Sequence, residues 1–351
     1  MERINVGVFD HLERTSSEGP LRQLFEERLR LVEAYEQAGI WGYHVAQHHA
    51  TPLGMAPSPN LFLAAAAQRT RNMRLGTLVY LLPFYNPLRL VEEICMLDHM
   101  TGGRLEIGVG RGVSPFEHAQ YRIPFYDARE IYEDAMTVLV KGLTSERLTH
   151  HGTHFRYDNV PMELRPLQQP HPGFWYGALS PDNAIYAARR GMNIVSIGGL
   201  NSVKQVTAAY REHHHESAGS PQNVNPHLSR PVTGAIRHIY VAETDREAEQ
   251  VASEAYRAFY ANIQKLWRDY NTAVLAFPPE YDLFHRVGAS FSGSVAAVRE
   301  QVAQFCEESG CDYLVLAFAW GNLTAAQSRR SFDLFASRIM PDFARRPALV
   351  A

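Results

Sequence analysis

The stretch PLRLVEEICMLDHMTGGRLEIGVGRG, residues 87–112, passes from a helix into a buried strand. Apolar residues recur at helical spacing over residues 88–100, which predicts a helix that begins close to Pro87. The pair Gly102 and Gly103 ends this helix, and the apolar run over residues 105–110 predicts a buried strand. A helix that leads directly into an apolar strand is typical of α/β folds.

The same alternation extends outward in both directions. Strands are predicted over residues 4–9, 41–47, 73–82, 105–110, 174–178, 193–197, 232–241 and 313–317. Helices are predicted over residues 21–39, 60–68, 88–100, 128–142, 183–190, 203–214, 246–267 and 325–339. Strict alternation implies parallel strands joined by crossover helices. Eight such units favour a closed (β/α)8 TIM barrel over an open doubly wound sheet.

No fixed repeat, low-complexity segment or linker-like change of composition divides the chain. We therefore expect one barrel domain over residues 1–351. Two long segments, near residues 144–172 and 246–292, are expected to be insertions at the C-terminal mouth of the strands, where barrels bind their ligands.

Composition excludes several classes of protein. The 34 Lys and Arg residues nearly balance the 37 Asp and Glu residues, so a generally basic nucleic-acid binder is excluded. The sequence has no apolar run of about 20 residues and no signal-like beginning, so we expect no membrane partner and a cytoplasmic location. Three cysteines are too few for a disulfide scaffold.

Active sites of TIM barrels lie where the strands end. His48 and His49 follow the second predicted strand. A histidine at that place can be a general acid or base, a metal ligand, or an ordinary loop residue with satisfied hydrogen bonds. A metal site needs further ligands, and the later strand ends present no cluster of carboxylates and histidines, so no metal ligands are assigned.

A second group of candidates suits a phosphate. Arg111 follows the fourth predicted strand, Arg129 begins the next helix, and Ser180 precedes Pro181 at the start of another helix. Guanidinium groups and helix N-termini both bind phosphate. The alternatives are a pair of surface arginines and an ordinary helix cap. The glycines of residues 108–112 form neither a dinucleotide fingerprint nor a Walker A motif, but they let the backbone approach a ligand. If these groups converge, they would bind a flavin mononucleotide or a phosphosugar.

Several segments resemble the bacterial-luciferase-like flavin monooxygenases. They are residues 47–49, 75–79, 87–112, 165–172 and 312–318, in matching order over nearly the whole chain. The resemblance implies a TIM barrel that binds reduced FMN non-covalently as a cosubstrate. It also implies a monooxygenase that passes one atom of O2 to a small organic substrate while the other leaves as water. The aromatic residues Tyr256, Phe259, Tyr260 and Trp267, which can be core residues or line a pocket, favour an apolar substrate.

The resemblance also assigns individual residues. His48 matches the family histidine implicated in catalysis, and Gln47 replaces the glutamate of the family's Glu-His-His motif. Luciferase has a reactive cysteine at the position of Gly110 and an acidic residue at that of Leu179. The bond between Leu78 and Val79 matches a non-proline cis peptide that lies under the flavin ring. The residues implied to bind the cofactor are Leu78, Val79, Gly110, Arg111, Arg129, Leu179 and Ser180.

The resemblance further implies a homodimer. It also implies a separate flavin reductase, because the sequence has no fingerprint for a nicotinamide nucleotide. Two other functions remain open. One is a deazaflavin (coenzyme F420)-dependent oxidoreductase on the same barrel, and the other is a non-catalytic flavin-binding protein.

Overall fold

Parallel strands close into a barrel in the computed structural model, which describes residues 3–15, 19–273 and 277–344. The eight barrel strands, in their order around the ring, are β1 (Asn5–Asp10), β2 (Gly42–Val45), β3 (Arg74–Thr77), β5 (Leu105–Gly110), β8 (Phe174–Gly177), β9 (Asn193–Ser196), β10 (Thr233–Ala242) and β12 (Tyr313–Ala317). Because β10 pairs with both β9 and β12, and β12 pairs with β1, the ring of these eight strands is closed. The predicted TIM barrel is confirmed.

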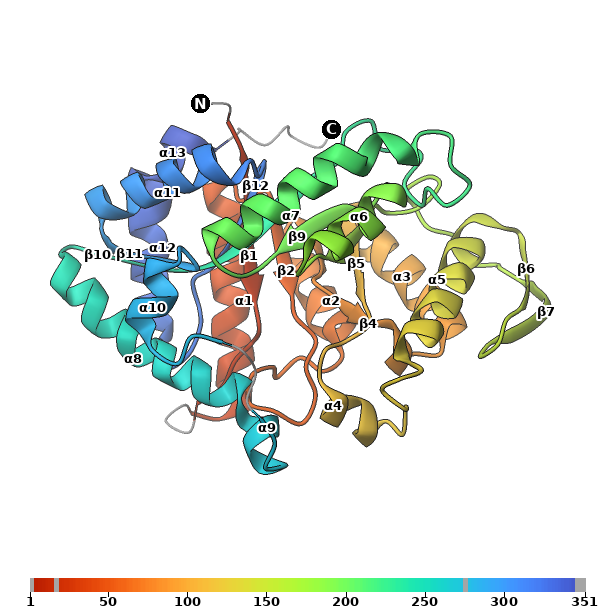
Figure 1. Ribbon diagram of the computed structural model, residues 1–351, viewed down its shortest axis with the longest axis horizontal. Coiled ribbons are helices and arrows are strands. Elements are labelled where there is room, and N and C mark those ends of the chain that lie inside the picture. Colours follow the sequence, from red (N-terminus) through yellow and green to blue (C-terminus); the bar gives the residue numbers. More distant parts are fainter. Residues whose placement is uncertain (1–2, 16–18, 274–276, 345–351) are drawn as a thin grey trace.

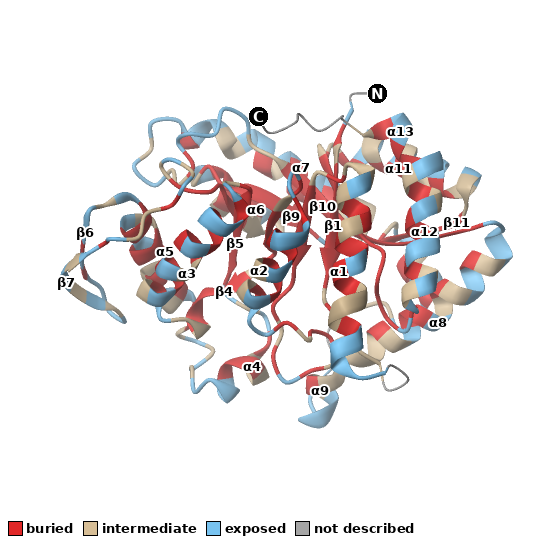
Figure 2. Cartoon of the chain, turned by 180° about the vertical axis from the view of Figure 1, so that it is seen from behind, coloured by how far each residue is buried: buried red, intermediate tan, exposed pale blue. Residues whose placement is uncertain are grey.

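Helices surround the strands (Figures 1 and 2). The longer helices are α1 (Leu21–Ala38), α2 (Pro59–Arg69), α3 (Pro87–Thr101), α5 (Ala128–Thr144), α6 (Pro181–Arg189), α7 (Leu200–His213), α8 (Asp245–Ile263), α11 (Val295–Ser309) and α12 (Ala325–Arg338). The short ones are η1 (Leu82–Phe84), α4 (Pro115–Gln120), η2 (His214–Ser217), α9 (Lys265–Asp269), α10 (Tyr281–Arg286) and α13 (Met340–Phe343). Their buried sides face the barrel and their exposed sides face outward (Figure 2).

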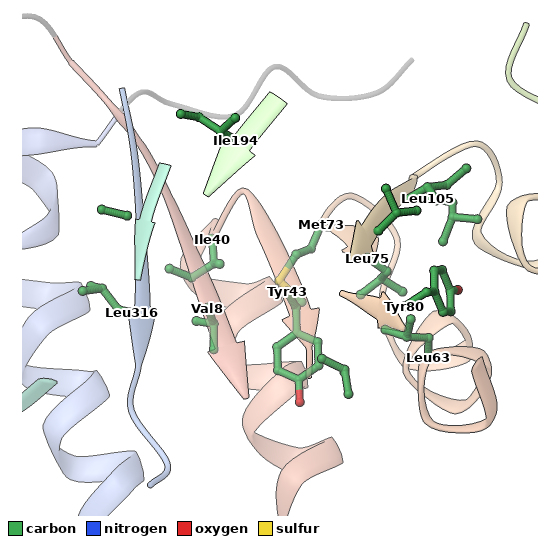
Figure 3. Packing of buried hydrophobic residues seen from close by; sticks show 14 of the residues in the cluster. Val8, Ile40, Tyr43, Leu63, Met73, Leu75, Tyr80, Leu105, Ile194 and Leu316 are labelled. Atoms are coloured by element: carbon green, nitrogen blue, oxygen red, sulfur yellow. The ribbon is translucent and has the colours of Figure 1, made fainter. Parts of the chain in front are cut away.

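The main apolar core lies between the ring of strands and the ring of helices. Figure 3 shows Val8, Tyr43 and Leu75 on neighbouring strands, with Leu63 of α2 packed in the same cluster. All four side chains are buried, and burial of a large apolar side chain stabilises the folded state by about 1.5–3 kcal/mol. This packing holds each helix against its strands.

The stretch from α3 into β5 folds as its sequence predicts. Asn86 caps α3 by accepting a hydrogen bond from the Arg89 N–H, and Pro87 occupies the first turn. Gly102 ends the helix in the left-handed conformation at φ 66°, which glycine adopts without a steric penalty. The strand β5 follows two residues later and is buried along its whole length.

The structure differs from the sequence prediction in several elements. The single strand predicted over residues 73–82 is divided into β3 and β4 (Tyr80–Leu81) around a cis peptide bond between Leu78 and Val79. The strand β11 (Ser290–Ser294) and the helices α4 and α11 were not predicted. β11 is rich in serine and glycine and therefore lacks the apolar run of a buried strand; it lies beside the second half of β10.

The segment over residues 144–172 contains a hairpin of β6 (Arg147–His151) and β7 (Arg156–Pro161). This segment leads from the end of α5 to the start of β8. It therefore reaches the amino ends of the strands, where Gln168 accepts a hydrogen bond from Arg74 and donates one to the Leu105 carbonyl. The last part of the segment thus lies at the end of the barrel opposite the expected mouth, because it leads into β8. The hairpin instead runs back along the outer helices, where Tyr157 donates a hydrogen bond to Asn86 at the start of α3 and His150 pairs with Asp134 of α5.

The amino-terminal half of the barrel interior is filled. Trp175 and Tyr313 are buried there, and the Tyr313 hydroxyl lies 2.8 Å from His44 Nε2. A Cβ atom on Gly7 would lie 1.9 Å from the Tyr313 hydroxyl oxygen, so glycine at this position makes room for the ring. Open space inside the ring is consequently left at the carboxyl ends of the strands.

Arg104, which follows the glycine pair, joins α2, α3 and β3. Its side chain is buried and donates hydrogen bonds to the carbonyl oxygens of Thr101, Met73 and Thr70. These carbonyl oxygens lie at the ends of helices and strands, where the element itself offers no backbone N–H to bond to them.

We expect Arg104→Met to lower the free energy of unfolding by about 3 kcal/mol, because several buried carbonyl oxygens would lose their donors. Chemical denaturation at neutral pH measures this change. Arg89→Met is the matched control, since Arg89 is exposed and, among the described residues, forms an ion pair with Glu93 alone, one helical turn away. Equal effects of the two substitutions would contradict this role of Arg104.

Candidate active site

A cavity of about 400 Å³ opens at the carboxyl ends of the strands. Its lining includes residues that follow β1, β2, β3, β5 and β8, together with side chains of α4, α5, α6, α8 and α10. Of the residues predicted from the sequence, it brings together His48, Leu78, Val79, Gly110, Arg111, Arg129 and Leu179. Ser180 is not part of the lining; its hydroxyl accepts the N–H of Asn183 and caps α6.

One end of the cavity carries unpaired positive charge. Arg111 and Arg129 are exposed to it, and neither guanidinium forms an ion pair with another residue that the structure describes. Both arginines lie near Tyr176. Burial raises the pKa of this phenol, and the positive charges of the two arginines partly oppose that rise. The arginines from separate segments therefore converge on one region.

Buried hydroxyl groups line the same end. The hydroxyl oxygens of Tyr132 and Tyr186 are buried and have no hydrogen-bond partner among the described residues. Arg190 lies over the Tyr186 ring. Its guanidinium also pairs with Glu133 at 3.3 Å, so the Glu133 carboxylate already has an ion-pair partner. Orphaned hydroxyls beside free guanidinium groups fit a ligand with a phosphate and further polar oxygens, as FMN has.

The floor of the cavity includes the cis bond between Leu78 and Val79. Gly110 on the neighbouring β5 lies against it: a Cβ atom at this position would be 2.5 Å from Val79 Cγ2. In this chain, a side chain at position 110 would have to displace Val79, which accounts for glycine where luciferase has cysteine.

His48 is held by a carboxylate. Its Nδ1 lies 3.4 Å from Oε1 of Glu117, a buried residue of α4. Burial alone would raise the pKa of Glu117, but the contacts with His48 and the His49 N–H outweigh it and lower the pKa. Glu117 is therefore ionised at neutral pH, and its negative charge favours a proton on the nearby Nδ1 atom. The Nε2 atom is then left as the basic atom of the neutral ring.

His49 belongs to a separate hydrogen-bond chain. Gln47 Oε1 accepts from the Leu81 N–H and the Tyr85 hydroxyl, so its amide nitrogen must face His49 Nε2, at 2.7 Å. His49 Nε2 is thus an acceptor, and Nδ1 donates to the Tyr121 hydroxyl at 2.7 Å. Burial lowers the pKa of His49, which agrees with a neutral ring. A glutamate at position 47 would accept from Nε2 and reverse this tautomer.

Two further histidines occupy the other end of the cavity. The ring of His11 lies 5.5 Å from that of His48, and His238 of β10 packs 4.5 Å from Phe259. Burial, together with the neighbouring Arg237, lowers the pKa of His238 to about 3. Burial also lowers the pKa of His11, so both rings are uncharged at neutral pH.

Short helices cover part of the mouth. Phe116 of α4 stacks on Tyr270 with ring centroids 4.5 Å apart and meets Trp267 of α9 edge to face. α4 and α9 lie at the lower end of the molecule in Figure 1, opposite the two termini. The contact joins the segment after β5 to the segment after β10.

A model of the luciferase-like monooxygenase family matches residues 4–313. The chain belongs to this family. Among curated proteins, it is 36% identical over 325 residues to an uncharacterized protein of Sinorhizobium fredii, with 92% of each chain covered. It is 30% identical to the oxygenase component of a flavin-dependent trigonelline monooxygenase of Acinetobacter baylyi, covering 72% of this chain and 69% of that one. Among solved structures, the monooxygenase RslO1 of Streptomyces bottropensis superposes with a TM-score of 0.83 at 26% identity, covering 97% of this chain and all of that one.

Sequence reasoning missed two residues of the cavity in this member of the luciferase-like monooxygenase family. Glu117 lies on a helix of six residues, which is too short for periodicity to reveal. His238 had a usable signal: it stands two residues after Ile236 in a predicted strand, and side chains two apart in a strand share a face. Ile236 points into the barrel, so His238 points to the same side.

Within residues 3–15, 19–273 and 277–344, no group of three or more histidine, cysteine, aspartate or glutamate side chains is placed to hold a metal ion. No helix in these ranges has both the length and the apolar character of a membrane span.

The lowered pKa of His238 predicts a pH-dependent stability. The unfolded ring gains a proton below about pH 6.5, whereas the folded ring stays neutral down to about pH 3, so falling pH favours unfolding. We expect His238→Phe to remove this effect. As the pH falls from 6.5 to about 4.5, the free energy of unfolding of the variant should therefore rise by about 2 kcal/mol relative to that of the wild type.

Urea denaturation at several pH values measures the difference between the two proteins. His215→Asn is the control, because His215 is exposed to water before unfolding as well as after. A constant difference between His238→Phe and the wild type across this pH range would contradict a neutral, buried His238.

Proposed function

We propose that this chain is the oxygenase of a two-component flavin monooxygenase, which uses reduced FMN and O2 to oxygenate a small apolar molecule. The observation that carries the proposal is one cavity with unpaired Arg111 and Arg129 at one end and the His48–Glu117 pair beside it. Membership of the luciferase-like monooxygenase family and the relative named as a flavin-dependent oxygenase component support it.

The cofactor residues divide by chemistry. Arg111 and Arg129 would hold the phosphate through charge-assisted hydrogen bonds, with Leu179 and the start of α6, capped by Ser180, beside them. The backbone at Leu78, Val79 and Gly110 would support the ring system. When bound, reduced FMN supplies the two electrons with which one atom of O2 enters the substrate and the other forms water.

The chain's own part is positioning, exclusion of water and movement of a proton. The negative charge of Glu117, 3.4 Å from His48 Nδ1, would favour a proton on that atom, so that Nε2 can accept a proton at the cavity and return it. The aromatic contact between α4 and α9 restricts access of water to the mouth. A separate flavin reductase would supply the reduced cofactor, as the name of the oxygenase-component relative indicates.

The phosphate assignment predicts the effect of removing both guanidinium groups. We expect Arg111→Ala combined with Arg129→Ala to weaken reduced-FMN binding by roughly a hundredfold or more, because two charge-assisted contacts would be lost. Anaerobic titration followed by flavin fluorescence measures the affinity. Arg22→Ala on the exposed face of α1 is the control. Unchanged affinity in the double variant would place the phosphate elsewhere.

The proton step predicts a different pattern for His48→Gln. Affinity for reduced FMN should stay within about threefold, while the reoxidation of bound reduced FMN by O2 should slow by roughly a hundredfold. Stopped-flow absorbance from pH 6 to pH 9 measures the rate, with His215→Gln as the control. An unaltered rate and pH profile would exclude His48 from the proton step.

The same titration separates the alternative functions. Tighter binding of a reduced deazaflavin than of reduced FMN, with no reaction with O2, would establish the hydride-transferring oxidoreductase instead. A protein that binds reduced FMN but lets O2 reoxidise it as in free solution would be a flavin-binding protein without catalysis.

A further inference from the structure

The end of the cavity away from Arg111 and Arg129 has aromatic walls. It is formed by residues on β1, β10, α8 and α10 and in the loop before α10, which are Phe9, Ile236, Phe259, Ile263, Phe277 and Phe284. β8 stands opposite β1 in the ring of strands, so the two ends lie across the barrel from each other. Figure 1 shows α8 and α10 on the left and α5 on the right.

This aromatic end holds no ionised group among the described lining residues. The charged side chains of the lining all come from the segments after β5 and β8: they are Arg111, Glu117, Arg129, Glu133 and Asp182. A carboxylate, sulfonate or quaternary ammonium group bound between the phenylalanines would be desolvated without a counterion, which is unfavourable by several kcal/mol.

The polar groups at the aromatic end are His11 and His238. His238 packs between Phe259 and Phe284, with ring centroids 4.5 and 5.6 Å away, and is nine-tenths buried. Its Nε2 has no hydrogen-bond partner among the described residues. His11 packs against Phe9 at 4.7 Å and is not hydrogen-bonded to another described residue through its ring. A buried imidazole without a partner is costly, and a ligand atom that bonds to it regains this energy.

We propose that this aromatic end binds the organic substrate, and that the substrate is an uncharged ring compound whose single hydroxyl or carbonyl oxygen hydrogen-bonds to His238. Flat aromatic walls suit a ring compound, and a neutral imidazole can donate to a carbonyl or accept from a hydroxyl. The inference rests on the proposed function, which places the cofactor phosphate at the other end. The substrate would then lie beside His11, whose ring is 5.5 Å from the ring of His48.

Equilibrium dialysis of the full chain against three probes tests the proposal. The probes are 2-naphthol, naphthalene, which lacks the oxygen, and 2-naphthoate, which is charged. We expect the wild type to bind 2-naphthol at least tenfold more tightly than 2-naphthoate. His238→Phe should weaken 2-naphthol binding by roughly tenfold and leave naphthalene binding within about twofold, because only the hydrogen bond is lost.

Two further variants control the interpretation. His238→Gln keeps a donor and an acceptor and should bind 2-naphthol within about threefold of the wild type, even if the phenylalanine variant folds poorly. His171→Phe removes a buried histidine from a separate cavity at the amino ends of the strands and should leave 2-naphthol binding unchanged.

The proposal is overturned if the wild type fails to bind 2-naphthol, if it prefers 2-naphthoate, or if His238→Phe weakens 2-naphthol and naphthalene equally. A loss of 2-naphthol binding in His171→Phe would also overturn it, since the probe would then occupy the other cavity. Reduced-FMN affinity is measured on the same proteins. Failure of the wild type to bind reduced FMN overturns the proposed function, whereas intact FMN binding with a failed probe experiment overturns only this inference.

Discussion

Closure of the barrel is the constraint on which the site depends. Val8 of β1 pairs with Leu316 of β12, so the two ends of the chain meet in one ladder, and the pairing of β9 with β10 completes the ring. A closed ring of parallel strands brings all the connections that leave the strands to one rim. His11, His48, Arg111, Leu179 and His238, which are far apart in the sequence, consequently line one cavity.

Burial then determines which of the ionisable groups at this rim carry charge. Desolvation keeps His11 and His238 neutral, because their surroundings are aromatic and hold no carboxylate. Glu117 is buried as well, yet its contacts with His48 and the His49 N–H keep it ionised. The cavity thus has a charged end and an uncharged end, a division that suits a phosphate-bearing cofactor and an apolar substrate.

Gln47 and Gly110, two positions at which this chain differs from the luciferase pattern, have local physical explanations. Gln47 is held in one orientation by the Leu81 N–H, and through this it sets the tautomer of His49. Gly110 leaves room for Val79 beside the cis bond. These changes alter hydrogen bonding and packing at the floor of the cavity and leave the arginines and the His48–Glu117 pair in place.

The amino-acid sequence by itself determined the order of strands and helices around the barrel and most of the candidate residues, including His48, Arg111 and Arg129. Hydrophobic periodicity and helix-ending glycines are local signals, and a run such as residues 87–112 carries them within one helix and one strand. Several elements escaped, two of them because they lack these signals: β11 is too polar and α4 is too short.

Only the tertiary structure decided which groups meet. The carboxylate of Glu117 reaches His48 across 69 positions of the chain, and no local pattern records such a contact. It also decided that Gln168 lies at the amino ends of the strands, that Ser180 caps a helix outside the cavity lining, and that His238 is uncharged. The physical reason is that contact and desolvation arise only when distant segments pack together, whereas periodicity and capping are properties of neighbouring residues.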